Sequence, residues 1–123
     1  MTILIVDDEV DIRTTLGSQF RKLGYDVVTA ENGEEGLQKV KEGNIDLVIL
    51  DLVLPKMQGE SVCKEIRKDE RVCKIPIIIL TVKKSDTDRV IGRVIGADSY
   101  ITKPSSPEIL INEVKRLISL RKP

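Results

Sequence analysis

The sequence predicts an α/β fold, an open doubly wound sheet of five parallel strands with helices on both faces. Short β-rich runs alternate strictly with amphipathic helical patterns along the 123 residues, which is typical of right-handed β-α-β crossovers. The third and fourth runs are almost wholly apolar, as in strands covered on both faces. We expect one domain over residues 1–120, with 121–123 as a tail or the start of a linker.

Five runs have the length and composition of β-strands. Each is short, rich in aliphatic and β-branched residues, and bounded by polar or turn residues. The predicted strands are residues 3–6, 26–29, 45–50, 77–80 and 99–102.

The first three helices are predicted from apolar spacing and end signals. The first has a stripe at spacings of four, four and three residues, which ends before Gly24: Ile12, Leu16, Phe20 and Leu23. The second opens at Asn32 and closes near Gly43, and the third covers about 60–68. Their inward positions are Leu37, Val40, Val62 and Ile66.

The last two helices carry clear caps. Ser85 and Asp88 have capping-box spacing, and Gly96 supplies the stop. The apolar stripe between them is Val90, Ile91, Val94 and Ile95. Ser106 as N-cap and Pro107 at the first helical position begin the final helix, expected to run to about residue 120. Its stripe is Leu110, Val114, Leu117 and Ile118.

Composition excludes several function classes. Basic and acidic residues both number 20, so direct binding of nucleic acid by this domain is not expected. The chain has no histidine, which removes Ser-His-Asp and Cys-His catalysis, and Cys63 and Cys73 are expected to be free buried or half-buried thiols.

No apolar run approaches the roughly 20 residues of a membrane span. Met1 leads directly into a strand, so no signal peptide and a cytoplasmic location are expected.

Polar residues gather where the predicted strands end. The carboxyl ends of parallel strands share one edge of the sheet, and ligands of such folds bind there. Residues from four strands are expected at this edge: Asp7, Asp8, Glu9, Asp51, Thr81 and Lys103.

This set of residues points to magnesium-assisted phosphoryl chemistry. Asp7, Asp8 and Asp51 would hold like charges close together, which a cation must offset, and few oxygen ligands with room for water suit Mg²⁺. With Lys103 beside the metal, Asp51 is placed to attack a phosphoryl group and become an aspartyl phosphate. Thr81 could donate a hydrogen bond to that group and so report its presence.

Four motifs, in order and at strand ends, resemble the receiver domain of bacterial two-component response regulators over nearly the whole chain. They are LIVDDE at 4–9, DLVLP at 51–55 followed by Gly59, Thr81, and YITKP at 100–104. The resemblance implies a flavodoxin-like (βα)5 fold with strand order 2-1-3-4-5.

The resemblance also implies a role for each residue of the site. Asp51 would be the phospho-acceptor, supplied by a sensor histidine kinase, a phosphotransfer protein or a small acyl phosphate. Asp8 would bind Mg²⁺ directly, Asp7 mainly through water, and Val53 through its backbone carbonyl. Lys103 would pair with the phosphoryl oxygens, and its bond to the following proline would be cis. Such a domain catalyses only its own phosphorylation and slow dephosphorylation, and is not otherwise an enzyme.

Thr81 and Tyr100 are the switch residues that the resemblance implies. On phosphorylation Thr81 would shift toward the phosphoryl group and Tyr100 would rotate inward. The face formed by the fourth helix, fifth strand and fifth helix would then change its affinity for a downstream output domain or protein, or for a second copy in a homodimer.

Two departures from the family pattern modify these expectations. Val82 replaces the small residue that usually follows the switch Thr, and we expect it to restrict water and slow the loss of phosphate. Asp98 is followed by Ser99, where regulators with winged-helix outputs commonly carry two acidic residues, so such an output is less expected. The adjacent Lys83 and Lys84 are expected on a solvated loop.

Three alternatives share part of the pattern. A mononucleotide binder needs a phosphate-cradling Gly, Ser or Thr loop after the first strand, and this loop is acidic. A metal-dependent phosphatase with an aspartyl phosphate typically has Asp-x-Asp, and Val53 stands at the second position. A receiver-shaped module that is never phosphorylated remains, although Asp51, Thr81 and Lys103 are all present.

Overall fold

The computed structural model describes residues 1–83 and 85–121 and confirms the predicted alternation of strands and helices. Lys84 of the expected loop and residues 122 and 123 of the expected tail lie outside the described residues. The strands are β1 (Thr2–Val6), β2 (Asp26–Ala30), β3 (Leu47–Leu50), β4 (Ile77–Thr81) and β5 (Ser99–Thr102). The helices are α1 (Val10–Lys22), α2 (Gly33–Glu42), α3 (Gly59–Lys68), α4 (Asp86–Val94) and α5 (Pro107–Arg121).

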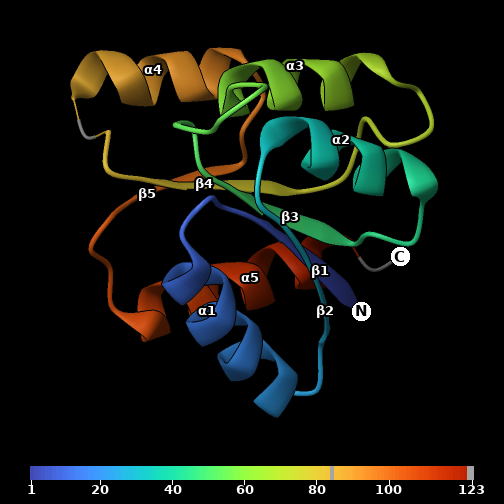
Figure 1. Ribbon diagram of the computed structural model, residues 1–123, viewed down its shortest axis with the longest axis vertical. Coiled ribbons are helices and arrows are strands. Elements are labelled where there is room, and N and C mark those ends of the chain that lie inside the picture. The colour runs from blue at the N-terminus through green and yellow to red at the C-terminus, as the bar shows by residue number, and fades with distance from the viewer. Residues whose placement is uncertain (84, 122–123) are drawn as a thin grey trace.

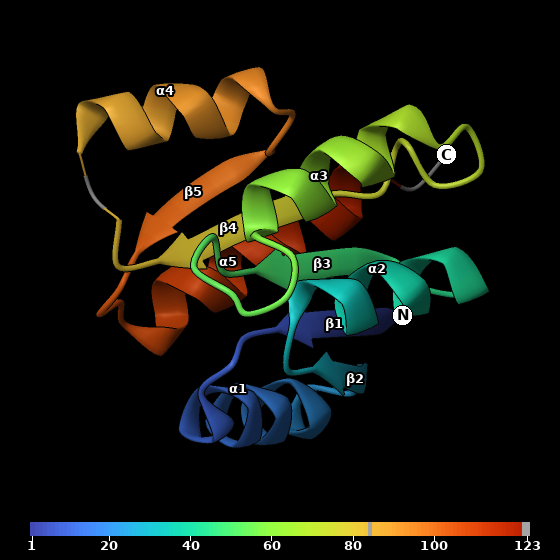
Figure 2. The same ribbon diagram turned by 45° about the horizontal axis from the view of Figure 1, so that its top comes forward.

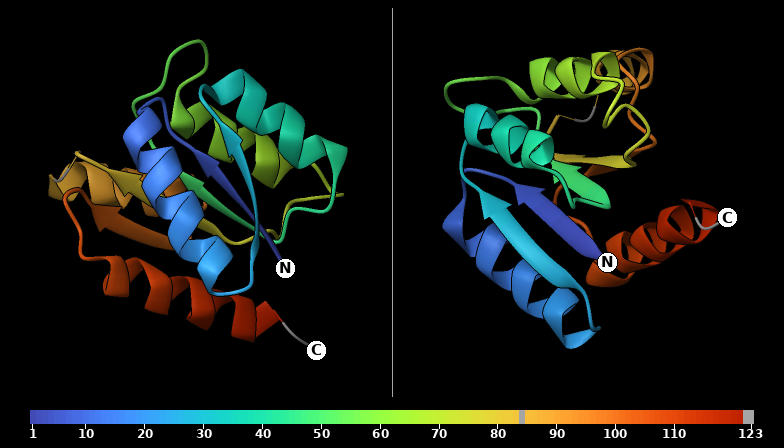
Figure 3. Two further views of the ribbon diagram at one scale, coloured as in Figure 1. Left: turned by 60° about the horizontal axis from the view of Figure 1, so that its bottom comes forward. Right: turned by 90° about the vertical axis from the view of Figure 1, so that its right-hand side faces the viewer.

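The strands form one parallel sheet in the order β2-β1-β3-β4-β5, as expected. Helices α1 and α5 cover one face, and α2, α3 and α4 cover the other (Figures 1 and 3). Successive side chains of a strand point to opposite faces, so Ile3 and Ile5 enter the core under α1 and α5, while Leu4 and Val6 enter the other. The sheet is therefore a rigid central layer with a core on each side.

The predicted helix starts are confirmed at α2, α4 and α5. The Asn32 side chain accepts a hydrogen bond from Glu35 N at 2.9 Å. Ser85 Oγ accepts from Asp88 N at 3.0 Å and donates to the Asp88 carboxylate at 2.6 Å. Helix α5 begins at Pro107, as expected. These caps satisfy amides that have no partner within the helix.

Two boundary predictions near the ends of elements are wrong. Strand β3 begins at Leu47, two residues later than expected. Asp46, just before it, donates from its backbone N to Thr2 O at 2.9 Å and accepts at its carboxylate from Thr2 N at 2.8 Å. Leu23, expected in the buried stripe of α1, is exposed. It lies beyond the last helical residue as the C-cap, where the chain turns toward β2.

Helix α4 turns most of its apolar stripe to solvent. Of the four residues of that stripe, only Ile95, just after the helix, is buried, whereas Val90, Ile91 and Val94 are exposed, the last at 80%. Gly92 is the only buried residue of the helix. A Cβ there would lie 2.7 Å from Cδ2 of Tyr100, so the tyrosine ring occupies the space under the helix. The apolar side chains of α4 consequently face outward.

All five strands end at one edge of the molecule, as Figure 2 shows by the direction of the arrows. The loops that follow β1, β3, β4 and β5 meet at this edge. In the described part of the chain, no helix is both long and apolar enough to cross a membrane.

Candidate functional site

Two buried carboxylates stand at the ends of the central strands. Asp7 and Asp51 are 2% and 5% exposed, and their backbone amides continue the sheet by donating to Ala30 O and Val6 O. Each side chain also accepts from an amide two residues on, Asp7 from Glu9 N at 3.0 Å and Asp51 from Val53 N at 3.1 Å. The strand ends and these local bonds fix both carboxylates at the functional edge.

Lys103 joins the two carboxylates. Its backbone amide donates to Thr81 O at 2.7 Å, and the bond to Pro104 is cis, as the resemblance implied. Its Nζ donates to Asp7 Oδ2 at 2.7 Å and to Asp51 Oδ2 at 3.0 Å. Burial would by itself lower the pKa of Lys103, but these hydrogen bonds hold that pKa above its ordinary value. The ammonium is therefore charged at neutral pH.

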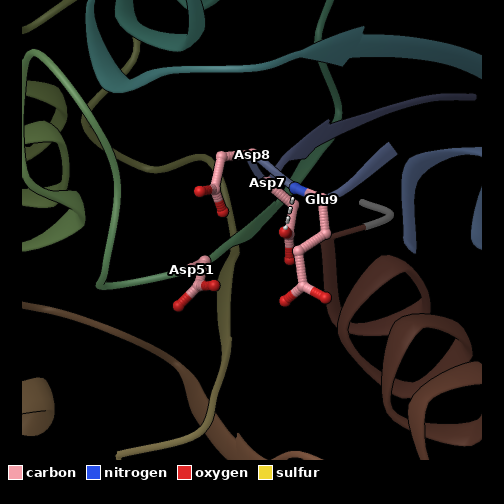
Figure 4. A group of neighbouring side chains, drawn as sticks. All are labelled: Asp7, Asp8, Glu9 and Asp51. Atoms are coloured by element: carbon pink, nitrogen blue, oxygen red, sulfur yellow. Dashed lines mark hydrogen bonds between the residues drawn. The ribbon is translucent and has the colours of Figure 1, made fainter. Parts of the chain in front are cut away.

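Four carboxylates lie close together at this site, and three of them contact the Lys103 ammonium. One oxygen each of Asp7, Asp8, Glu9 and Asp51 lies within 4.8 Å of the others (Figure 4). Burial, with a smaller contribution from the neighbouring charge of Asp51, raises the pKa of Asp7, although its bonds to Lys103 and to the amide of Glu9 act in the opposite direction. The negative charge here is thus incompletely compensated by the protein. An oxygen-only set with exposed Asp8 at its rim fits a hard divalent cation such as Mg²⁺.

The loop after β3 packs closely beneath Asp51. Gly59, the first residue of α3, donates from N to Leu52 O at 3.0 Å, and a Cβ at Gly59 would lie 2.0 Å from Asp51 O. No larger residue fits there without moving the backbone that carries Asp51. Leu52 and Leu54 are buried and Val53 is exposed. The Val53 amide donates to the Asp51 side chain. Binding of Mg²⁺ by the Val53 carbonyl stays a prediction.

The two expected switch residues both contact the loop after β4. Thr81 is fully buried, and its Oγ1 accepts from Lys83 N at 3.5 Å. The half-buried Tyr100 donates from its hydroxyl to Lys83 O at 2.7 Å, and burial raises its pKa. Its ring lies against Gly92, with the Arg89 guanidinium 5.6 Å from the ring centre. Tyr100 therefore already lies half-buried under α4 in this structure.

The two departures from the family pattern differ in their surroundings. Val82 is 59% exposed and lines a hollow of about 440 Å³ together with Lys103 and residues of α1 and the β5–α5 loop. Asp98 Oδ2 accepts from Ile77 N at 2.8 Å and from an Arg67 NH2 group at 2.9 Å, and the Ser99 hydroxyl donates to Glu113. Both Asp98 and Ser99 thus have partners within the chain.

Asp7, Asp51 and Lys103 lie together at this edge, as expected, but several residues around them had no expected role. Glu9 stood in a quoted motif, yet its contact with Lys103 Nζ at 3.3 Å was not expected. The contacts of Arg67 with the end of α4, and the place of Gly92 above the tyrosine ring, were also not expected. The only signals in the sequence were an acidic residue after Asp8 and a glycine inside a helical pattern.

The chain belongs to the response regulator receiver domain family, which it matches over residues 3–115. It is a receiver domain of a two-component response regulator with a flavodoxin-like fold. It is 44% identical over 116 residues to the alkaline phosphatase synthesis transcriptional regulatory protein PhoP of Bacillus subtilis, covering 94% of this chain and 48% of that protein. It is 47% identical over 122 residues to the probable transcriptional regulator ycf27 of Cyanidium caldarium, covering 97% and 48%. The chain thus spans about half the length of these curated relatives.

Solved structures give the same result. The receiver domain of the Francisella response regulator 1452 superposes with a TM-score of 0.92 at 31% identity, covering 98% of each chain. Receiver domains are signalling domains that interact with histidine kinases and output domains.

Proposed function

We propose that Asp51 accepts a phosphoryl group in a magnesium-dependent reaction and that the protein acts as a phosphorylation-driven switch. An Asp51 carboxylate oxygen forms a bond to phosphorus as the bond to the donor's leaving group breaks, and the leaving group departs with the electron pair. The donor is a histidine kinase, a phosphotransfer protein or a small acyl phosphate. The chain acts on no external substrate, and slow hydrolysis of the aspartyl phosphate resets it.

The observation that carries the proposal is the position of the Lys103 ammonium between two buried carboxylates. Nζ lies 2.7 Å from Asp7 Oδ2 and 3.0 Å from Asp51 Oδ2. A fixed cation beside the acceptor stabilises charge on the transferring oxygens without reorganising during the reaction. Asp51, directly after β3, is both buried and paired with Lys103, so it is the residue we assign as acceptor.

Asp7, Asp8, Asp51 and the Val53 carbonyl would hold Mg²⁺. Bound there, Mg²⁺ supplies charge that offsets the carboxylates and the phosphoryl oxygens. The four crowded carboxylates support this assignment, since one ammonium leaves most of their charge unbalanced.

Thr81 and Tyr100 would pass the phosphorylation state to the surface. Both contact Lys83 in the loop that leads into α4. A shift of Thr81 toward a phosphoryl group would therefore move Lys83 and change its hydrogen bond with Tyr100. The exposed Val90, Ile91 and Val94 of α4 support binding of a partner, or of a second copy, on the face formed by α4, β5 and α5. The equilibrium between two states of this face is what phosphorylation would shift.

The output of the switch is a proposal too. Relatives about twice as long as this chain are named transcriptional regulators. The Asp98-Ser99 departure makes a winged-helix output less expected, but the names of these relatives favour a gene-regulatory output, and we give the names more weight. Direct nucleic-acid binding by this domain remains unexpected, and the cytoplasmic location stays a prediction.

The test is to incubate the protein with acetyl phosphate and to measure uptake of a phosphoryl group from the intact mass of the protein. We expect one added phosphoryl mass in wild type with Mg²⁺, none with EDTA, and none in Asp51→Asn. Asp26→Asn, an exposed aspartate at the start of β2, is the matched control and should react like wild type. A wild-type chain that never gains this mass, or an Asp51→Asn variant that still does, would favour the unphosphorylated interaction module or another acceptor.

A further inference from the structure

Glu9 is a third acceptor for the ammonium of Lys103. Its Oε1 lies 3.3 Å from Nζ, beyond the contacts to Asp7 and Asp51. An ammonium has three N–H donors, and in this site three carboxylates accept them. Every donor that Lys103 could offer to a phosphoryl oxygen is therefore occupied before phosphorylation.

The three acceptors are not equivalent. The side chains of Asp7 and Asp51 are almost fully buried, whereas that of Glu9 is 57% exposed and makes the longest of the three contacts. Glu9 also lines the hollow that opens beside Lys103 and Val82. Of the three carboxylates, Glu9 is the one that can swing into solvent at least cost.

We propose that Glu9 is a specificity-determining residue that holds the third donor of Lys103 until a phosphoryl group displaces it, and that its charge disfavours small anionic phosphodonors. The inference rests on the proposed function of Asp51. In the reaction with an acyl phosphate, a bond forms between an Asp51 oxygen and phosphorus, the phosphorus–oxygen bond to the acyl group breaks, and the carboxylate leaves with the electron pair. The donor is an anion when it enters the site, so the negative charge of Glu9 repels it during its approach.

A rival role for Glu9 gives the opposite expectation. One of its oxygens lies within the same 4.8 Å cluster as those of Asp7, Asp8 and Asp51, so Glu9 could simply add to magnesium binding. In that case its neutralisation would weaken Mg²⁺ binding and slow phosphorylation. If Glu9 instead occupies Lys103 and repels the donor, neutralisation speeds phosphorylation at saturating Mg²⁺.

The test compares Glu9→Gln with wild type in acetyl phosphate at saturating Mg²⁺. The amide keeps the size of the side chain and removes its charge. We expect phosphorylation to be about 3- to 10-fold faster at low ionic strength, with the ratio falling toward one as salt screens the repulsion. Titration calorimetry with Mg²⁺ alone should show equal or weaker Mg²⁺ binding by the variant, so that the faster rate cannot come from tighter binding of the metal.

Asp11→Asn is the control for a general charge effect. Asp11 is exposed in the first turn of α1, two residues from Glu9, and its substitution removes the same charge. Its rate should stay close to that of wild type. An unchanged or slower Glu9→Gln rate, or an increase that does not depend on salt, would overturn the role of Glu9 while leaving that of Asp51 intact. Failure of wild type to gain a phosphoryl group would instead overturn the proposed function, and this inference with it.

Discussion

Val82 stands next to the fully buried Thr81, yet its own side chain is 59% exposed. It lines the same hollow as Lys103 and Glu9, two residues of the acidic site. If water reaches a phosphoryl group on Asp51 through this hollow, a branched side chain at position 82 would take up part of the space that the water needs.

We therefore expect Val82→Ala to lose phosphate about threefold faster than wild type, a change of less than ~1 kcal/mol in the barrier. The measurement is the decay of the phosphorylated mass after the donor is removed. Val90→Ala, an equally exposed valine on α4, should leave the decay rate unaltered. Equal lifetimes for Val82→Ala and wild type would show that this side chain does not control access of water.

Helix α4 is attached most firmly at its C-terminal end. Arg67 of α3 donates from Nε to Gly96 O at 2.8 Å and from NH1 to Ile75 O at 2.6 Å, and Cys63 Sγ contacts Ile95 O at 3.3 Å. The carbonyls that end α4 thus find donors on α3. The other end of the helix leads into the loop that Thr81 and Tyr100 contact, so movement of the switch would be largest there.

Arg67→Ala removes the main donor of this attachment. It removes the donor to the carbonyls of Gly96 and Ile75 and one of two donors to the Asp98 carboxylate, which keeps its bond from Ile77 N. We expect a loss of about 2–4 kcal/mol in the free energy of unfolding. Denaturant unfolding measures this loss.

Arg71→Ala, which breaks only an exposed pair with Asp69, is the control and should leave the midpoint nearly unchanged. The buried Cys63, whose pKa burial raises to about 11, should also be alkylated faster in Arg67→Ala, because its cover at the end of α4 loosens. Stability and Cys63 protection equal to those of wild type would contradict this account.

Helix α4 shows what an apolar pattern can and cannot predict. Its stripe correctly indicates a helix, but periodicity carries no information on whether the stripe meets the sheet or an outside partner. In α5 the stripe faces inward, and in α4 the ring of Tyr100 under Gly92 turns it outward. Asp7, Asp51 and Lys103 were predictable because parallel strands end at one edge. The contact of Glu9 was not, since it depends on the reach of a side chain from the loop after β1.

The chain has zero net charge, yet it concentrates four carboxylates at one edge of its sheet. Arg and Lys residues elsewhere balance the total but do not relieve the local repulsion, because exposed charges are screened beyond about 10 Å. Folding brings these carboxylates together, so the site should lower the stability of the metal-free protein.

We therefore expect Asp8→Asn to raise the melting temperature in EDTA by about 2–4 °C. In wild type, Mg²⁺ should raise the melting temperature by binding the folded state, and this rise should be much smaller in the variant. Differential scanning calorimetry in EDTA and in Mg²⁺ measures both effects, with Asp26→Asn as the control that should follow wild type in each. An Asp8→Asn protein that is less stable without metal, or that gains as much from Mg²⁺ as wild type, would mean that Asp8 neither adds to the repulsion nor binds the ion. The expected result would mean that the metal site is maintained at the expense of stability.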